Sequence, residues 1–168
     1  VEEESLEISA ITATSAGDMN AVALAAGMAE NGAQGAKDTL EALWRGISRS
    51  GRSLTPYGAL SPIAFAYASA VQSLASPYDL NPFNINPLRD VVKDVIDFSK
   101  VDDSGIQLFL SATNVESGHV TVFKDGDISL DTVLASACLP QTFQAVEIDG
   151  EAYWDGGFMG NPSLFPLI

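Results

Sequence analysis

A serine at position 15 separates a short apolar run from an alanine-rich run. Around it the chain reads Ala13-Thr14-Ser15-Ala16-Gly17, which matches the nucleophile-elbow pattern with alanine in place of its first glycine. In an elbow the serine lies on a tight turn between a strand and a helix, so the residues two before and two after it must be small. The N–H of Ala16 would then face a developing oxyanion. The pattern predicts a nucleophilic Ser15, although a plain helix N-terminus capped by a hydroxyl has the same residues.

A serine hydroxyl needs a base to accept its proton. Near the end of the chain Asp155 is followed by Gly156 and Gly157. Two glycines let a second segment approach closely, which suits a carboxylate that packs against a serine turn. We therefore expect Asp155 to be the base, while an ordinary Asp-Gly surface turn is the simpler interpretation of this segment alone.

The sequence contains a single histidine, His119. It precedes an apolar stretch typical of a hairpin strand, where an exposed histidine is common. A Ser-acid-His triad esterase that uses His119 is the alternative, with an acid from residues 79–103 that no motif marks.

Several segments are expected to position these residues. Periodicity and turn residues predict helices at 16–26, 36–47, 63–74 and 86–97, and strands at 7–13, 106–112, 120–123, around 128 and at 146–148. Residues 48–62 and 76–87 are rich in Pro, Gly and Asn and are expected to be irregular. Interleaved helices and strands in 168 residues predict one α/β domain, a layered sandwich.

Charge and composition exclude several function classes. The formal net charge is -14, so the chain repels nucleic acid, and contact with a lipid surface would have to come from apolar side chains. One cysteine, Cys138, allows no intrachain disulfide and is expected to be a buried thiol. No export signal or membrane-spanning run is visible, which makes the cytoplasm the expected compartment.

Three blocks of residues together resemble patatin-like phospholipases, particularly bacterial ones. They are Thr14-Ser15-Ala16-Gly17 with Met19-Asn20-Ala21, then Ala135-Ser136-Ala137-Cys138-Leu139-Pro140, then Tyr153-Trp154-Asp155-Gly156-Gly157 with Asn161-Pro162. Their order and spacing fit the family, and the likeness runs from about Ile8 to Pro166.

The resemblance implies a three-layer α/β/α sandwich with a central, mainly parallel sheet, akin to the catalytic domain of cytosolic phospholipase A2. It implies a lipid acyl hydrolase with a Ser15–Asp155 dyad, an acyl-enzyme, and no cofactor or metal. The substrates implied are phospholipids, lysophospholipids or other acyl esters, met by transient contact with a membrane surface. The family also places a glycine-rich oxyanion loop before the serine strand and continues past the position of Ile168. We therefore expect a chain without that loop and continuation, which leaves a catalytically weak binding protein of the same fold as a further alternative.

Overall fold

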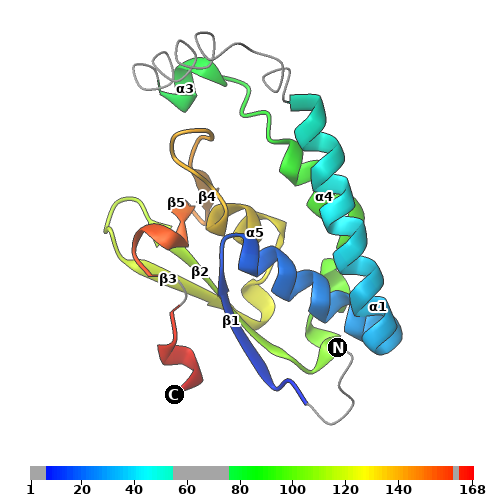
Figure 1. Cartoon of the computed structure of the whole chain (residues 1–168). Helices are drawn as coiled ribbons and strands as arrows, with labels where there is room; N and C mark the ends of the chain where they lie inside the picture. The colour runs from blue at the N-terminus through cyan, green and yellow to red at the C-terminus, as the bar shows by residue number, and fades with distance from the viewer. Residues whose placement is uncertain (1–6, 55–75, 161–162) are drawn as a thin grey trace.

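The computed structural model describes residues 7–54, 76–160 and 163–168 (Figure 1). The described residues form a five-stranded sheet and four α-helices. The strands are β1 (Ala10–Thr14), β2 (Gln107–Asn114), β3 (Val120–Lys124), β4 (Val146–Ile148) and β5 (Glu151–Asp155). The helices are α1 (Ala16–Leu54), α3 (Pro77–Leu80), α4 (Pro87–Val95) and α5 (Leu130–Ser136).

The sheet is mixed, so the expectation of a mainly parallel sheet is wrong for the described residues. β2 pairs in parallel with β1, whereas β2–β3, β2–β5 and β4–β5 are antiparallel. For β2–β3 and β4–β5 the physical reason is a short connection, because a turn of two to five residues can join only antiparallel strands. Between β4 and β5 this turn is Asp149-Gly150, with φ angles of 52° and 84°, as a hairpin turn requires.

β2 is the central strand, and its partners show which strand ends meet. β1 pairs with residues 107–111 of β2, β3 with residues 109–113 and β5 with residues 112–114. The β3 register overlaps both others, so β3 must lie on one side of β2 while β1 and β5 lie on the other. β1 runs parallel to β2 and β5 runs antiparallel. The C-terminal ends of β1 and β5 therefore meet head to head beside Ser111 and Ala112.

Helix α1 is two helices joined by a kink. Asn31 and Gly32 depart from helical geometry, with Gly32 at φ 56°, and the two halves pack closely after the bend. A Cβ built on Gly27 would lie 2.4 Å from the carbonyl oxygen of Gly35, so only glycine permits this approach. The two helices predicted at 16–26 and 36–47 are thus confirmed, but both extend further than expected.

The helices share one hydrophobic core with β2. α1, α4 and α5 contact one another, and α1 and α5 contact β2, and Figure 1 shows α1 and α4 side by side. The largest fully buried apolar side chains come from these helices and β2: Val22, Leu43, Val92, Leu110, Val133 and Leu134. The fold is α/β, as expected. The sandwich with a helical layer on each face stays a prediction.

Some segments differ from the sequence-based expectations. The strand expected around Ile128 is absent, because Ile128 lies between a 3-10 turn at Asp125–Asp127 and α5. α1 continues to Leu54 through residues expected to be loop, and α3 forms one turn where Ser76 and Asp79 make a capping box. Helix α5 was not predicted. The helix expected at 63–74 and the loop beyond 54 lie outside the described residues.

Candidate active site

Ser15 occupies a sharp turn where β1 runs directly into α1. Its φ is 58°, a left-handed conformation that is uncommon for residues other than glycine and is often found at functional sites. The turn is closed by a hydrogen bond from the Asp18 N–H to the Ser15 carbonyl oxygen at 3.0 Å. A Cβ built on Gly17 would lie 3.5 Å from the Ala13 Cβ, which is an ordinary van der Waals distance, so the start of α1 packs against the end of β1 here without a close backbone approach.

The backbone of this turn is held by Ser136, at the end of α5. The Ser15 N–H donates to Ser136 Oγ at 2.8 Å, and Ser136 Oγ donates to the Ser111 carbonyl oxygen at 2.7 Å. Ser136 is fully buried. One hydroxyl therefore ties the serine turn to α5 and β2. Sequence reasoning did not assign this role to Ser136, although the residue belongs to the second block of the family resemblance.

Asp155 ends β5 and is fixed by bonds to its backbone and side chain. Its N–H donates to the Cys138 carbonyl at 2.9 Å, and Thr113 Oγ1 donates to its carbonyl at 2.9 Å. The Gly157 N–H donates to Asp155 Oδ1 at 2.7 Å. The residue is 5% exposed. These contacts set the carboxylate at one position at the end of the strand.

Gly156 allows the end of β5 to press against the end of β1. A Cβ built on Gly156 would lie 2.2 Å from the Ser111 carbonyl oxygen and 2.9 Å from Thr14 Cγ2. Asp155 pairs with Ala112 on β2, and Thr14 pairs with the adjacent Ser111. The structure thus brings Ser15 and Asp155, 140 positions apart in the sequence, to one junction of the sheet. No hydrogen bond joins their side chains in the described residues; such bonds are often loose without substrate.

His119 lies elsewhere. It is exposed and precedes β3, and its carbonyl accepts the Asn114 N–H at 2.9 Å. Ser111 pairs with Val122, three residues beyond His119, a span of roughly 10 Å along a strand. β3 also lies on the side of β2 opposite β1. The structure does not bring His119 to the serine turn.

A second aspartate lies beneath the turn. Asp18 is fully buried in the first turn of α1, and neither of its carboxylate oxygens has a hydrogen-bond partner. Burial raises its pKa from 3.8 to about 8, helped by the negative charge of Asp155 and opposed by the nearby Ser136 hydroxyl. Sequence reasoning did not assign a role to Asp18.

The predicted buried thiol is confirmed. Cys138 is 1% exposed, and burial raises its pKa to about 11, which keeps it neutral. Within the described ranges of the chain, no three His, Cys, Asp or Glu side chains are grouped as metal ligands would be.

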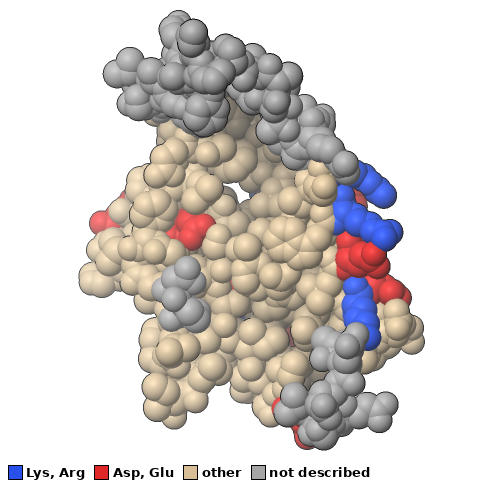
Figure 2. Space-filling view, in the orientation of Figure 1, with Lys and Arg blue, Asp and Glu red and all other residues tan. Residues whose placement is uncertain are grey.

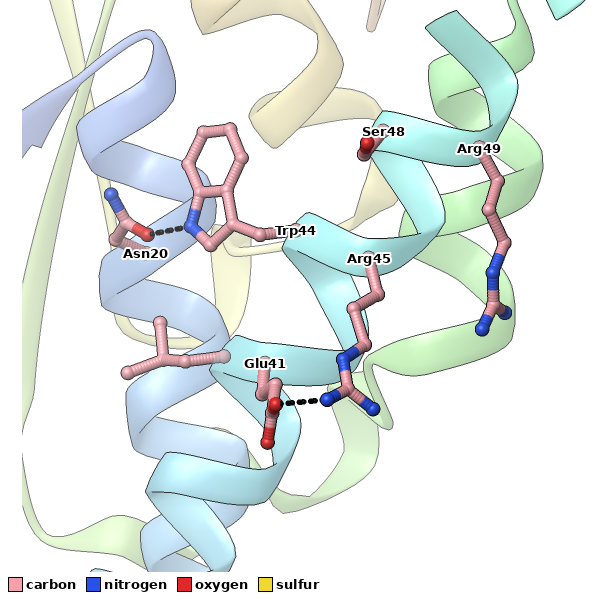
Figure 3. Close-up of a pocket in the computed structure, with 7 residues that line it drawn as sticks. Asn20, Glu41, Trp44, Arg45, Ser48 and Arg49 are labelled. Carbon is pink, nitrogen blue, oxygen red and sulfur yellow. Dashed lines mark hydrogen bonds and ion pairs between the residues drawn. The ribbon is translucent and has the colours of Figure 1, made fainter. Parts of the chain in front are cut away.

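Two hollows lie along α1, and the first of them adjoins the serine turn. The first, about 360 Å³, is mainly apolar and is lined by β1 and the start of α1: Ile11, Thr12, Ala13, Thr14, Gly17, Asn20, Ala21 and Leu24. It shares Asn20 with a larger hollow of about 740 Å³ along α1. There the Trp44 indole N–H donates to Asn20 Oδ1 at 2.8 Å, and Arg45 pairs with Glu41 (Figure 3).

Uncharged and apolar surface is extensive on a chain of such high net charge. In Figure 2 much of the face in view is neither acidic nor basic, and basic side chains gather along one edge. Four apolar residues in and after α3 are exposed: Tyr78 at 57%, Leu80 at 49%, Phe83 at 86% and Ile85 at 65%. We call these four residues the α3 patch. In the part of the chain that the structure describes, no helix combines the length and apolarity needed to span a bilayer.

Comparison with known proteins identifies the family. A search of curated proteins finds no match to this sequence. The sequence profile described as Patatin-like phospholipase matches residues 1–168, which is the whole chain. Proteins of this family are hydrolases of the phospholipase type. The chain, with its serine turn and the aspartate that adjoins it, belongs to the patatin-like phospholipase family.

Proposed function

We propose that this protein is a lipid acyl hydrolase that uses Ser15 as nucleophile and Asp155 as general base, within a single catalytic domain. The observation that carries the proposal is the close approach of Gly156 to Thr14 and Ser111. The end of β5, which carries Asp155, therefore lies beside the serine turn, where a base could accept the proton of the Ser15 hydroxyl.

The reaction has two steps. Asp155 takes the proton of the Ser15 hydroxyl as the oxygen attacks the ester carbonyl, and the carbonyl oxygen becomes an oxyanion. The Ala16 N–H, at the positive end of α1, stabilises that charge. The oxyanion collapses, the alcohol leaves with the proton from Asp155, and an acyl-Ser15 ester remains. Asp155 then takes a proton from water, which attacks the acyl ester. The Ser15 oxygen leaves with that proton from Asp155, which releases a fatty acid and restores the Ser15 hydroxyl and the Asp155 carboxylate.

Three features support a lipid substrate. The family is one of phospholipase-type hydrolases. The apolar hollow of about 360 Å³ flanks the serine turn and would hold part of an acyl chain of a phospholipid, lysophospholipid or other ester. The α3 patch supplies exposed apolar side chains for transient contact with a membrane surface, which the net charge would not provide.

A binding protein that keeps the fold without efficient catalysis is the second candidate. The observation in its favour is that no hydrogen bond joins Ser15 to Asp155 in the described residues. The triad esterase is disfavoured, because His119 lies on the opposite side of β2 from the serine turn.

Hydrolysis of a p-nitrophenyl acyl ester and of phospholipid vesicles tests the proposal. Ser15→Ala and Asp155→Asn should each lower kcat by at least ~1000-fold, the scale expected when a nucleophile or its base is removed. His119→Ala and the exposed Ser117→Ala, as matched controls, should retain activity. Activity that survives in both dyad variants excludes the mechanism. Loss in Ser15→Ala and His119→Ala, with activity retained in Asp155→Asn, supports the triad.

A further inference from the structure

Asp18 lies three residues after Ser15, fully buried and without a hydrogen-bond partner for either oxygen. An ionised carboxylate in such a position would have lost its hydrogen bonds to water without forming hydrogen bonds to the protein, which costs free energy. Buried carboxyl groups of this kind take up a proton instead. The proposed dyad mechanism does not use Asp18, although this residue lies beneath the serine turn.

The hydrogen bonds of Ser136 limit what Asp18 can do. A hydroxyl carries one hydrogen and accepts up to two. Ser136 Oγ donates its one hydrogen to the Ser111 carbonyl oxygen and accepts a hydrogen bond from the Ser15 N–H. A bond from Ser136 to an ionised Asp18 would need that same hydrogen. The bond still open to Ser136 Oγ is an acceptance, and a protonated Asp18 has a hydrogen to donate.

The charge near Asp18 also favours the neutral acid. Asp155, on β5, acts on Asp18 with a negative charge that raises its pKa. Ser136 on α5 is uncharged, and the Cys138 thiol that follows α5 is neutral because its pKa is raised to about 11. Two buried carboxylates near one another rarely ionise together. A general base must be ionised, so the mechanism proposed for Asp155 is compatible with a proton on Asp18.

We propose that protonated Asp18 is a positioning residue for the serine turn, that it donates to Ser136 Oγ, and that its ionisation switches the site off. This inference rests on the proposed function, because it regulates the same site. Ionisation removes the donated hydrogen and places a second negative charge three residues from Ser15. That charge opposes the oxyanion that forms beside the Ala16 N–H. Ester hydrolysis should therefore fall as the pH rises above about 8.

The pH dependence of kcat from pH 6 to 10 tests the inference with wild type, Asp18→Asn and Asp18→Ala. Wild type should lose up to about tenfold in kcat per pH unit above the ionisation midpoint. Asp18→Asn should lack this descending limb and show a modestly lower kcat at pH 7. Asp18→Ala should also lack it, with kcat about five- to tenfold lower and KM little changed, as loss of one hydrogen bond predicts. Asp38→Asn, which alters an exposed aspartate on α1, should keep the wild-type profile.

A second measurement separates this inference from the proposed function. The ¹³C shift of the Asp18 carboxyl and the ¹⁵N shift of the Ser15 amide should change together with one midpoint near pH 8 in wild type. In Asp18→Asn the Ser15 change should vanish. These shifts decide the inference even in a protein without esterase activity, in which case only the proposed function fails. An Asp18 midpoint near pH 4, or a descending limb that persists in Asp18→Asn, overturns it.

Discussion

Replacing Gly156 by alanine tests whether the ends of β1 and β5 meet as described. The new Cβ would lie 2.2 Å from the Ser111 carbonyl oxygen and 2.7 Å from its carbon. These are backbone atoms in the middle of β2, so they cannot rotate away. Relief requires the segment after Asp155 to move by about 1 Å, since nonbonded carbon and oxygen atoms rarely approach within about 3.2 Å.

The size of the effect follows from that displacement. Overpacking of a tight contact costs about 1 to 3 kcal/mol, which for a chain of this size lowers the melting temperature by roughly 3 to 10 °C. A 1 Å shift of a reacting group costs on the order of 100-fold in rate. We therefore expect Gly156→Ala to lower kcat about 100-fold at 20 °C, where the variant stays folded, with a smaller change in KM.

Thermal unfolding by circular dichroism and steady-state ester hydrolysis measure both effects. Gly126→Ala is the matched control, because a Cβ there meets nothing within 4 Å, and it should change neither quantity appreciably. The described contact between Gly156 and Ser111 is wrong if Gly156→Ala melts within about 1 °C of wild type and keeps kcat within about twofold. Such a change in kcat would be far smaller than the reduction on the order of 100-fold expected from a displacement of about 1 Å.

Three further predictions concern the network, the buried acid and the surface. Ser136→Ala leaves the Ser15 N–H and the Ser111 carbonyl without their partner and should lower the free energy of unfolding by about 2 to 4 kcal/mol; an unchanged urea midpoint would contradict this. The pKa of Asp18 is 3.8 in the unfolded chain and about 8 in the folded protein. Between pH 3.8 and about pH 8 the folded state therefore binds more protons at Asp18 than the unfolded state does. The free energy of unfolding should then fall as the pH rises from about 4 to 8 and level off above, by at most about 6 kcal/mol at about 1.4 kcal/mol per pKa unit. Asp18→Asn should remove this slope in urea titrations, and equal slopes in both proteins would refute the assignment. Phe83→Ser, at a side chain 86% exposed, should weaken hydrolysis of vesicle lipid several-fold by loss of roughly 1 to 2 kcal/mol of apolar contact but not hydrolysis of a soluble ester; equal loss on both substrates would argue against membrane contact through the α3 patch.

The sequence predicted those elements whose signals are local. The Asn86-Pro87 start of α4 was predicted because an N-cap and a proline at the first position act within one turn, and Asn86 Oδ1 does accept the Leu88 N–H. The strand at 146–148 was predicted, and the Asp149-Gly150 turn that joins it to β5 is likewise a local signal. The α5 helix was missed because seven residues carry too little periodicity. The helix is stabilised by its local Ser129 cap and by packing against strands that are distant in the sequence.

The candidate site was predictable in part. The glycines after Asp155 predict a place of close approach, and the structure shows one at Gly156, whereas a Cβ on Gly17 would make only an ordinary contact. Ser136 and Asp18 acquire their roles only through contacts made by folding, since the Ser15 N–H meets a hydroxyl 121 positions away. No spacing rule reveals such a partner. The mixed sheet was not predicted, because the antiparallel pairing of β5 with β2 joins segments far apart in the sequence and has no local signal.

Covalent labelling of Ser15 by a fluorophosphonate, followed by mass spectrometry of the Ser15 peptide, tests the central claim most directly. Wild type and His119→Ala should both become labelled on Ser15, whereas Asp155→Asn should react at least ~100-fold more slowly because the hydroxyl has lost its base. A wild-type protein that stays unlabelled at Ser15, or an Asp155→Asn variant that labels at the wild-type rate, would contradict the account.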